Sequence, residues 1–139
     1  MKVVIVGCGR VGSKVAVRLD DEGHEVTVID NDPSQFRRFL PPSFNGQTFT
    51  GSATDHRVLV EAGVERADAF LALTPGDNRN VLASQIAKHV YGVENVVTRL
   101  ADPFRAELSQ RLGLRTFSPT NIGADLAYRA LFSETVDRD

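Results

Sequence analysis

The sequence predicts an α/β fold in which six parallel strands form one doubly wound sheet with helices on both faces. Short apolar runs rich in Val, Ile, Leu and Phe alternate with amphipathic stretches along the chain, which is typical of repeated β-α-β units. Several runs lack polar alternation, as expected for strands that helices cover on both faces. The strands are expected at Lys2–Val6, Glu25–Ile29, Gln47–Thr50, Ala69–Leu73, Asn95–Thr98 and Arg115–Phe117.

Each helix between these strands has a start or a stop signal in the sequence. Pro33 and Pro103 suit the first turn of a helix. Suitable N-cap residues are Thr54, Asp102 and either Asp77 or Asn78. Glycines that end helices in a left-handed conformation are expected at Gly23, Gly63, Gly92 and Gly113. The helices are expected at Arg10–Glu22, Pro33–Leu40, Asp55–Ala62, Arg79–Tyr91, Pro103–Leu112 and Asn121–Phe132.

The last predicted helix, Asn121–Phe132, has apolar residues at helical spacing and is followed by the polar segment SETVDRD. Such a helix either closes the edge of the sheet or crosses to a partner, and both interpretations remain open at this point. Its apolar residues are Ile122, Leu126, Ala127, Ala130 and Leu131.

Composition favours a folded cytoplasmic protein. The 139 residues, 42% hydrophobic and 24% charged, suit one globular domain over residues 1–139. A formal net charge of −2 without a run of Lys and Arg argues against nucleic acid as a partner. The cytoplasm is favoured because the chain has a single cysteine and shows no signal-peptide pattern. It also has no apolar run near the roughly 20 residues that span a bilayer.

The segment GCGRVG lies between the first strand and the first helix. There Gly7 permits a tight turn, Gly9 lets a pyrophosphate approach the backbone, and Gly12 lets the helix pack closely on the sheet. Free N–H groups and the helix dipole favour a phosphate at the helix start, and Arg10 adds a cation. The glycine spacing in this context predicts a nucleotide-binding site.

Asp30 ends the second predicted strand, in VTVIDND. A carboxylate there accepts hydrogen bonds from ribose hydroxyls and repels a 2′-phosphate, so NAD, ADP or ATP is favoured over NADP. The preference is relative, because Arg37 and Arg38 are near enough in sequence to reach a 2′-phosphate. The alternative is that Asp30 is a solvated carboxylate at the strand end or a helix cap, but the glycine turn before it favours the nucleotide role.

Polar residues follow three further strands at the carboxyl edge, where open α/β sheets bind ligands. In TGSATD, contact with the adenosine half or ordinary helix capping explains Gly51, Ser52 and Ala53. In LTPGDNRN, the residues that face the cleft or cap the helix are Thr74, Asp77 and Asn80. Arg99 reaches a phosphate, a neighbouring subunit or only solvent.

Signals for other chemistry are weak. The three histidines share no metal-ligand spacing, so no metal site is predicted. Cys8 is expected to be a small buried side chain, since no second thiol is present. A hydride-transfer enzyme needs a positioned acid or base and a substrate pocket, and the sequence shows neither, which favours regulation over catalysis.

The motifs GCGRVG, VTVIDND, TGSATD, ADAFLALTPGDNRN, VVTRLADP and GLRTFSPTNIGA occur in this order over nearly the whole chain. Together they resemble the N-terminal nucleotide-binding regulatory domains, called TrkA-N or RCK domains, of Trk and Ktr potassium uptake systems and of some potassium channels. The resemblance implies a Rossmann-like sheet that binds NAD(H) or an adenine nucleotide (ADP or ATP), forms dimers and larger rings, and gates a separate membrane potassium transporter.

The resemblance also assigns positions. The phosphate turn corresponds to Gly7, Gly9, Arg10, Val11 and Gly12. Asp30 matches the ribose acid, Asn31 the adenine contact and Arg99 the arginine after the fifth strand. The T-x-x-D-x-x-N element corresponds to Thr74, Asp77 and Asn80. Ser52 departs from the family's frequent GDAT pattern, in which an aspartate follows the glycine, and the terminal helix resembles the family's crossover helix.

The sequence therefore predicts a non-enzymatic regulatory subunit that meets a potassium transporter at the inner face of the cell membrane. Its expected partners are the transporter and a second copy joined through the terminal helix. The C-terminal domain common in the family is expected to be absent here, so that either the sequence is a piece of a longer chain or a further partner carries that domain. The alternatives are an NAD-dependent oxidoreductase fragment and a purely structural oligomerisation module.

Overall fold

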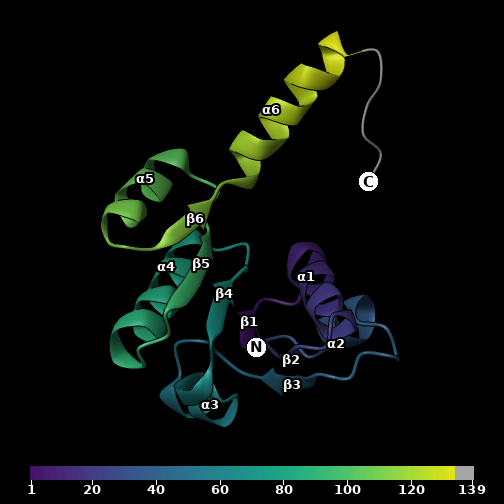
Figure 1. Ribbon diagram of the computed structural model, residues 1–139, viewed down its shortest axis with the longest axis vertical. Coiled ribbons are helices and arrows are strands. Elements are labelled where there is room, and N and C mark those ends of the chain that lie inside the picture. Colours follow the sequence, from purple (N-terminus) through teal and green to yellow (C-terminus); the bar gives the residue numbers. More distant parts are fainter. Residues whose placement is uncertain (134–139) are drawn as a thin grey trace.

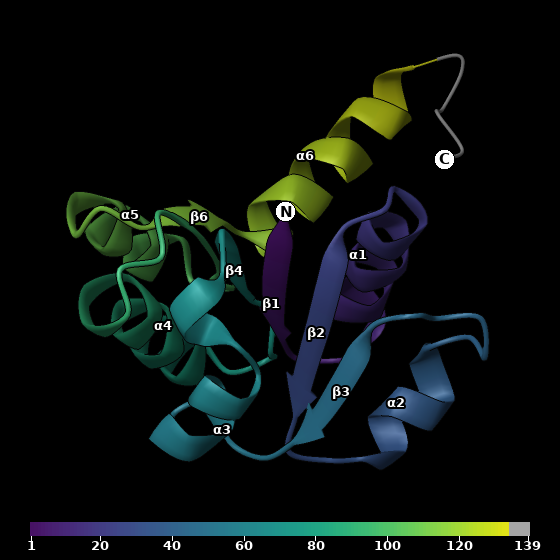
Figure 2. The same ribbon diagram turned by 60° about the horizontal axis from the view of Figure 1, so that its bottom comes forward.

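The protein forms one six-stranded parallel sheet in a computed structural model that describes residues 1–133 (Figures 1 and 2). The strand order is β3-β2-β1-β4-β5-β6, which confirms the predicted doubly wound sheet. Each strand lies within one residue of its expected bounds. The strands are β1 (Lys2–Val6), β2 (Glu25–Asp30), β3 (Gln47–Thr50), β4 (Ala69–Ala72), β5 (Asn95–Arg99) and β6 (Arg115–Phe117).

Helices cover the sheet on two faces, with α1 and α2 apart from α3 and α4 (Figure 1). The helices are α1 (Arg10–Asp21), α2 (Ser34–Phe39), α3 (His56–Glu61), α4 (Asp77–Gln85), α5 (Pro103–Arg111) and α6 (Pro119–Phe132), with a 3-10 turn η1 (Val64–Arg66) and a π-helical turn η2 (Ile86–Val90). Because side chains alternate along a strand, β1 contributes to two cores. Val4 packs in a cluster with Leu59 of α3 and Ala83 of α4. Its neighbour Ile5 packs in a second cluster with Ala16 of α1.

The structure confirms the predicted cap Asp102 and shows that the predicted cap Thr54 is wrong. The Asp102 carboxylate accepts a hydrogen bond from the N–H of Phe104 (3.0 Å) and caps α5. At α3 the cap is Asp55, whose carboxylate accepts from the N–H of Arg57 (2.9 Å), and not Thr54. The left-handed glycines after helices are confirmed, with positive φ at Gly23, Gly63, Gly92 and Gly113.

The start of α4 differs from the expectation. Its N-cap is Gly76 without a side-chain cap, so neither Asp77 nor Asn78 caps this helix. The carboxylate of Asp77, the first residue of α4, instead accepts hydrogen bonds from the N–H groups of Ala101 (2.8 Å) and Asp102 (3.0 Å). Asp77 therefore fixes the loop between β5 and α5 against the start of α4.

The terminal helix α6 projects away from the sheet beyond β6 (Figures 1 and 2). Its N-cap Ser118 accepts, through Oγ, a hydrogen bond from the N–H of Asn121 (3.3 Å). No residue of α6 is buried, so the helix does not close the edge of the sheet, and its crossing to a partner stays a prediction. Its large exposed apolar residues are Ile122, Leu126, Tyr128, Leu131 and Phe132.

Within residues 1–133, no helix combines the length and the apolar character that crossing a membrane requires.

A buried asparagine joins α4 to two strand ends. Asn80 is fully buried. Its Oδ1 accepts hydrogen bonds from the N–H (3.0 Å) and the Oγ1 (2.6 Å) of Thr74, which follows β4. Its Nδ2 donates to the carbonyl of Thr74 (2.8 Å) and to the carbonyl of Arg99 at the end of β5 (2.9 Å). All four bonding positions of the amide are thus used inside the protein.

Replacing this amide is expected to destabilise the fold. Asn80→Ala leaves the N–H of Thr74 and two carbonyls without their buried partner, so we expect a loss of about 2–3 kcal/mol in the free energy of unfolding. Urea denaturation measures the loss, with the exposed Asn95→Ala as control, for which we expect a change within about 0.5 kcal/mol. Equal midpoints for both variants would contradict this role.

Candidate functional site

A cleft of about 540 Å³ opens at the carboxyl edge of the sheet. Four connections border it: the glycine turn after β1, the β2–α2 loop, the β3–α3 turn, and the β4–α4 turn with the first turns of α4. The predicted site residues that line the cleft are Gly7, Asp30, Asn31, Gly51, Ser52, Ala53 and Thr74. Other predicted residues lie outside its lining, namely Gly9, Arg10, Val11, Gly12, Asp77, Asn80 and Arg99.

The three glycines of the turn after β1 have different roles. A Cβ at Gly12 would lie 1.8 Å from the carbonyl oxygen of Gly7, so Gly12 is required for the turn itself to close against α1. Gly7 has φ +100°, and a Cβ there would lie 2.8 Å from the backbone nitrogen of Thr74. A Cβ at Gly9 would meet no atom within 4 Å. Gly9 therefore leaves a side of the turn open for a ligand.

The backbone N–H groups at the start of α1 are available to a ligand. The N-cap of α1 is Gly9, which offers no side-chain cap. The first N–H groups of a helix have no partner within the helix, and an anion satisfies them while gaining from the helix dipole. The start of α1, beside the open face of Gly9, therefore suits a phosphate group.

The Asp30 carboxylate links the glycine turn to the loop after β2. Its Oδ2 accepts a hydrogen bond from the N–H of Cys8 (2.8 Å), and its Oδ1 accepts from the N–H of Asp32 (2.9 Å). Each carboxylate oxygen accepts more than one hydrogen bond, so both retain capacity for ribose hydroxyls. Asp30 is thus a structural link that keeps acceptor capacity at the edge of the cleft.

Asp32 also lines the cleft and was missed from the sequence. Its Oδ1 accepts from the Oγ (2.7 Å) and the N–H (3.0 Å) of Ser34, and these bonds lower the pKa of the Asp32 carboxyl. The pattern Asp-x-Ser at a loop before a helix is the signal that predicts this arrangement. Asp32 therefore brings a second negative charge to the same side of the cleft.

The β3–α3 turn forms the cleft's base. Because Asp55 caps α3, the hydroxyls of Ser52 and Thr54 are not used as its caps; their oxygens lie 2.8 Å apart and share a hydrogen bond. The Ser52 Oγ also accepts from the N–H of Thr54 (3.2 Å). Gly51 allows this turn beside α3, since a Cβ there would lie 2.6 Å from a methyl group of Val58. Two hydroxyl-bearing residues thus line the cleft at this turn.

The β4–α4 wall contains residues that sequence reasoning missed, namely Pro75, Arg79 and Leu82. The polar groups predicted there act inside the protein, because Asn80 holds two strand ends and Asp77 holds the β5–α5 loop. The sequence signal that could have indicated them is the spacing of Arg79 and Leu82, which lie three residues apart and therefore on one face of the helix.

The arginines that were predicted to lie near the phosphate contact other groups of the protein. The Arg10 guanidinium carbon lies 5.7 Å from the ring centre of Phe39, and that of Arg38 lies 5.0 Å from the same ring. Arg99 donates from Nη1 to the carbonyl of Thr74 (3.2 Å), and within residues 1–133 its buried Nε has no hydrogen-bond partner. Arg37 and Arg38 do not line the cleft.

Cys8 is fully buried inside the glycine turn, as predicted. Burial, and then the nearby Asp30 carboxylate, raise the pKa of its thiol to about 11. The thiol is therefore protonated at neutral pH, which makes it a packing group.

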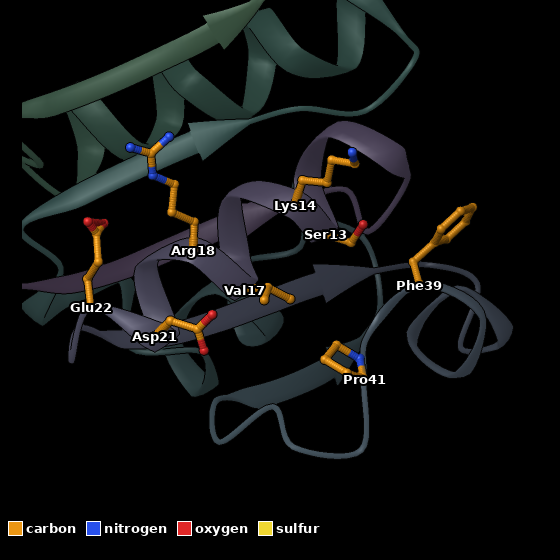
Figure 3. A pocket seen from close by; sticks show the side chains of 8 residues that line it. All are labelled: Ser13, Lys14, Val17, Arg18, Asp21, Glu22, Phe39 and Pro41. Carbon is orange, nitrogen blue, oxygen red and sulfur yellow. The ribbon is translucent and has the colours of Figure 1, made fainter. Parts of the chain in front are cut away.

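A second hollow of about 490 Å³ lies between α1 and the end of α2 with the segment after it (Figure 3). Figure 3 shows side chains of both charges from α1, with Phe39 and Pro41 across from them. None of the predicted site residues lines this hollow.

The sequence matches the TrkA-N domain family over residues 3–119. The Trk system potassium uptake protein TrkA of Streptomyces coelicolor is 50% identical over 131 residues, which cover 94% of this chain and 58% of that protein. The chain thus spans less than two thirds of the length of this relative.

Solved structures share the fold. The Shewanella denitrificans Kef CTD in AMP-bound form superposes with a TM-score of 0.77 at 22% identity and covers 97% of this chain and 84% of that one. GsuK bound to ADP gives a TM-score of 0.79 at 23% identity over 94% of this chain and 33% of that one. The family match extends over most of the sequence, and the chain belongs to the TrkA-N domain family.

Proposed function

We propose that this chain is a regulatory domain of a potassium uptake system and binds an adenine nucleotide, either NAD(H) or ADP/ATP, in the cleft. One observation carries the proposal: the backbone at Gly9 is open at the uncapped start of α1, beside the Asp30 carboxylate. A pyrophosphate and its ribose would occupy these two places together. The relative named as a potassium uptake protein supports the transport role. The AMP-bound and ADP-bound structures support the ligand class.

The residues divide into two groups under this proposal. Backbone N–H groups of the turn from Gly9 to Gly12 hold the phosphates, with Arg10 and Val11 at the helix start. Asp30 binds the ribose, and Asn31, Ser52 and Ala53 contact the adenine. A second group acts by positioning the β4–α4 wall, because its polar atoms bond to protein: Thr74, Asp77, Asn80 and Arg99.

We propose further that the nucleotide is sensed and not converted. Proton transfer requires a positioned acid or base. The two carboxylates that line the cleft already accept backbone N–H groups, and its lining contains no His, Cys, Lys or Tyr. A ligand that is bound but not converted acts by binding one arrangement of the protein more tightly than another.

The arrangement that the ligand changes is proposed to be an assembly through α6. The exposed apolar face of this helix would pack on a second copy of the chain, in a dimer or a larger ring. We propose that this assembly meets a membrane potassium transporter at the inner face of the cell membrane.

Blocking the open face of Gly9 is expected to abolish binding and to leave the fold intact. Gly9 has φ −91°, which valine tolerates, and its Cβ would meet no protein atom. In isothermal calorimetry we expect Gly9→Val to lose at least tenfold in affinity for ADP and NAD, and Asp30→Ala to do the same, with Glu94→Ala at the other edge of the sheet as control. Unchanged affinity of Gly9→Val would contradict the phosphate position, and a wild-type protein that binds none of NAD, NADH, ADP and ATP would contradict the function.

A charge on α6 is expected to dissociate the assembly. Leu126 is 59% exposed, and Leu112 at the end of α5 is 54% exposed. In sedimentation velocity we expect Leu126→Glu to shift the protein towards monomer, because a desolvated carboxylate in an apolar interface is unfavourable. The matched control Leu112→Glu should sediment as the wild type. Dissociation by the control alone would assign the interface to α5 instead.

A further inference from the structure

The α4 wall of the cleft carries one cation and one large apolar side chain. Arg79 and Leu82 both line the cleft. They lie three residues apart on the helix and therefore project from one face. Arg79 is the only cation among the cleft-lining residues of the described chain, and Leu82 is 51% exposed.

The guanidinium of Arg79 has no partner among the residues that the structure describes. Within residues 1–133 no hydrogen bond, ion pair or ring contact involves it. Neither carboxylate of the cleft lining forms an ion pair with Arg79 within residues 1–133: Asp30 accepts from the N–H of Cys8, and Asp32 from the N–H of Ser34. The neighbouring Arg105, in contrast, is paired with Asp102. Arg79 is therefore left for a group that the ligand brings.

The surroundings of Arg79 select the base of the nucleotide and not its phosphate. The phosphate position lies at the start of α1, whereas Leu82 continues the α4 wall one turn further from the start of that helix. An anion gains nothing from an exposed leucine, but a flat aromatic ring covers apolar surface. A guanidinium is itself planar and stacks on aromatic faces. A neutral base is also compatible with the carboxylates of Asp30 and Asp32 opposite.

We infer that Arg79 stacks on the adenine ring and, with Leu82, forms the outer wall of a base slot whose floor is the Ser52–Thr54 turn. The inference rests on the proposed nucleotide binding and adds a residue that sets affinity for the base. The flat face of the Arg79 guanidinium thus contributes more to binding of the base than its positive charge does.

Three ligands separate a base contact from a phosphate contact. The full chain, as wild type, Arg79→Ala and Arg79→Lys, is titrated with adenosine, AMP and ADP, by calorimetry where affinity permits and by ligand-detected NMR for adenosine. We expect Arg79→Ala to lose about tenfold in affinity for each of the three ligands, the same factor in every case. Arg79→Lys keeps the positive charge but lacks the planar guanidinium, so its affinity for each ligand should fall by nearly the same factor.

Arg111→Ala, an exposed arginine on α5, is the matched control and should bind all three ligands as the wild type does. A loss confined to AMP and ADP, or full rescue by Arg79→Lys, would show a phosphate contact and overturn the inference. Unchanged affinity of Arg79→Ala would also overturn it while the proposed function stands. A wild type that binds none of adenosine, AMP and ADP would overturn the inference, and one that also fails to bind NAD, NADH and ATP would overturn the proposed function as well. Equal thermal midpoints of the unliganded variants establish that the fold is intact.

Discussion

The shape of the cleft depends on the Asp30 carboxylate, which accepts hydrogen bonds from Cys8 in the glycine turn and from Asp32 in the loop after β2. Hydrogen bonds to an ionised group are stronger than neutral ones, so one side chain holds two connections together. The turn itself is tightly closed, because Gly12 fits against the carbonyl of Gly7 with no room for a Cβ. The proposed phosphate and ribose positions are thus held in place without a ligand, which would lower the entropic cost of binding.

Hydrogen bonds between side chains and backbone groups also hold the β4–α4 wall of the cleft. Asn80 bonds to backbone groups at the ends of two neighbouring strands, and Asp77 bonds to the loop after β5. Because these polar groups are used internally, Arg79 is the group that this wall presents to a ligand. A change in the wall would also reach β5 and, through the following β6, the start of α6, which gives the proposed sensing a physical route from cleft to assembly.

Local patterns predicted the sheet well and the site only in part. The apolar runs located every strand to within a residue, because six buried parallel strands leave little alternative for such runs. Thr54 and Asp55 both suit an N-cap, and local sequence does not decide between adjacent polar residues. Asn80 was expected in the cleft or at a cap and is in neither place, since its four bonds come from strands that meet it only in the folded protein. Arg79 was missed because the orientation of α4 about its axis is a tertiary property.

The most direct test of the account is a map of backbone amide chemical shifts of the ¹⁵N-labelled chain during titration with ADP. We predict that the largest saturable shifts occur at Gly9, Asn31 and Ser52, on the three sides of the proposed nucleotide. The account is contradicted if saturating ADP shifts none of these amides, or if the largest shifts occur at Lys14 and Arg18 in the hollow of Figure 3.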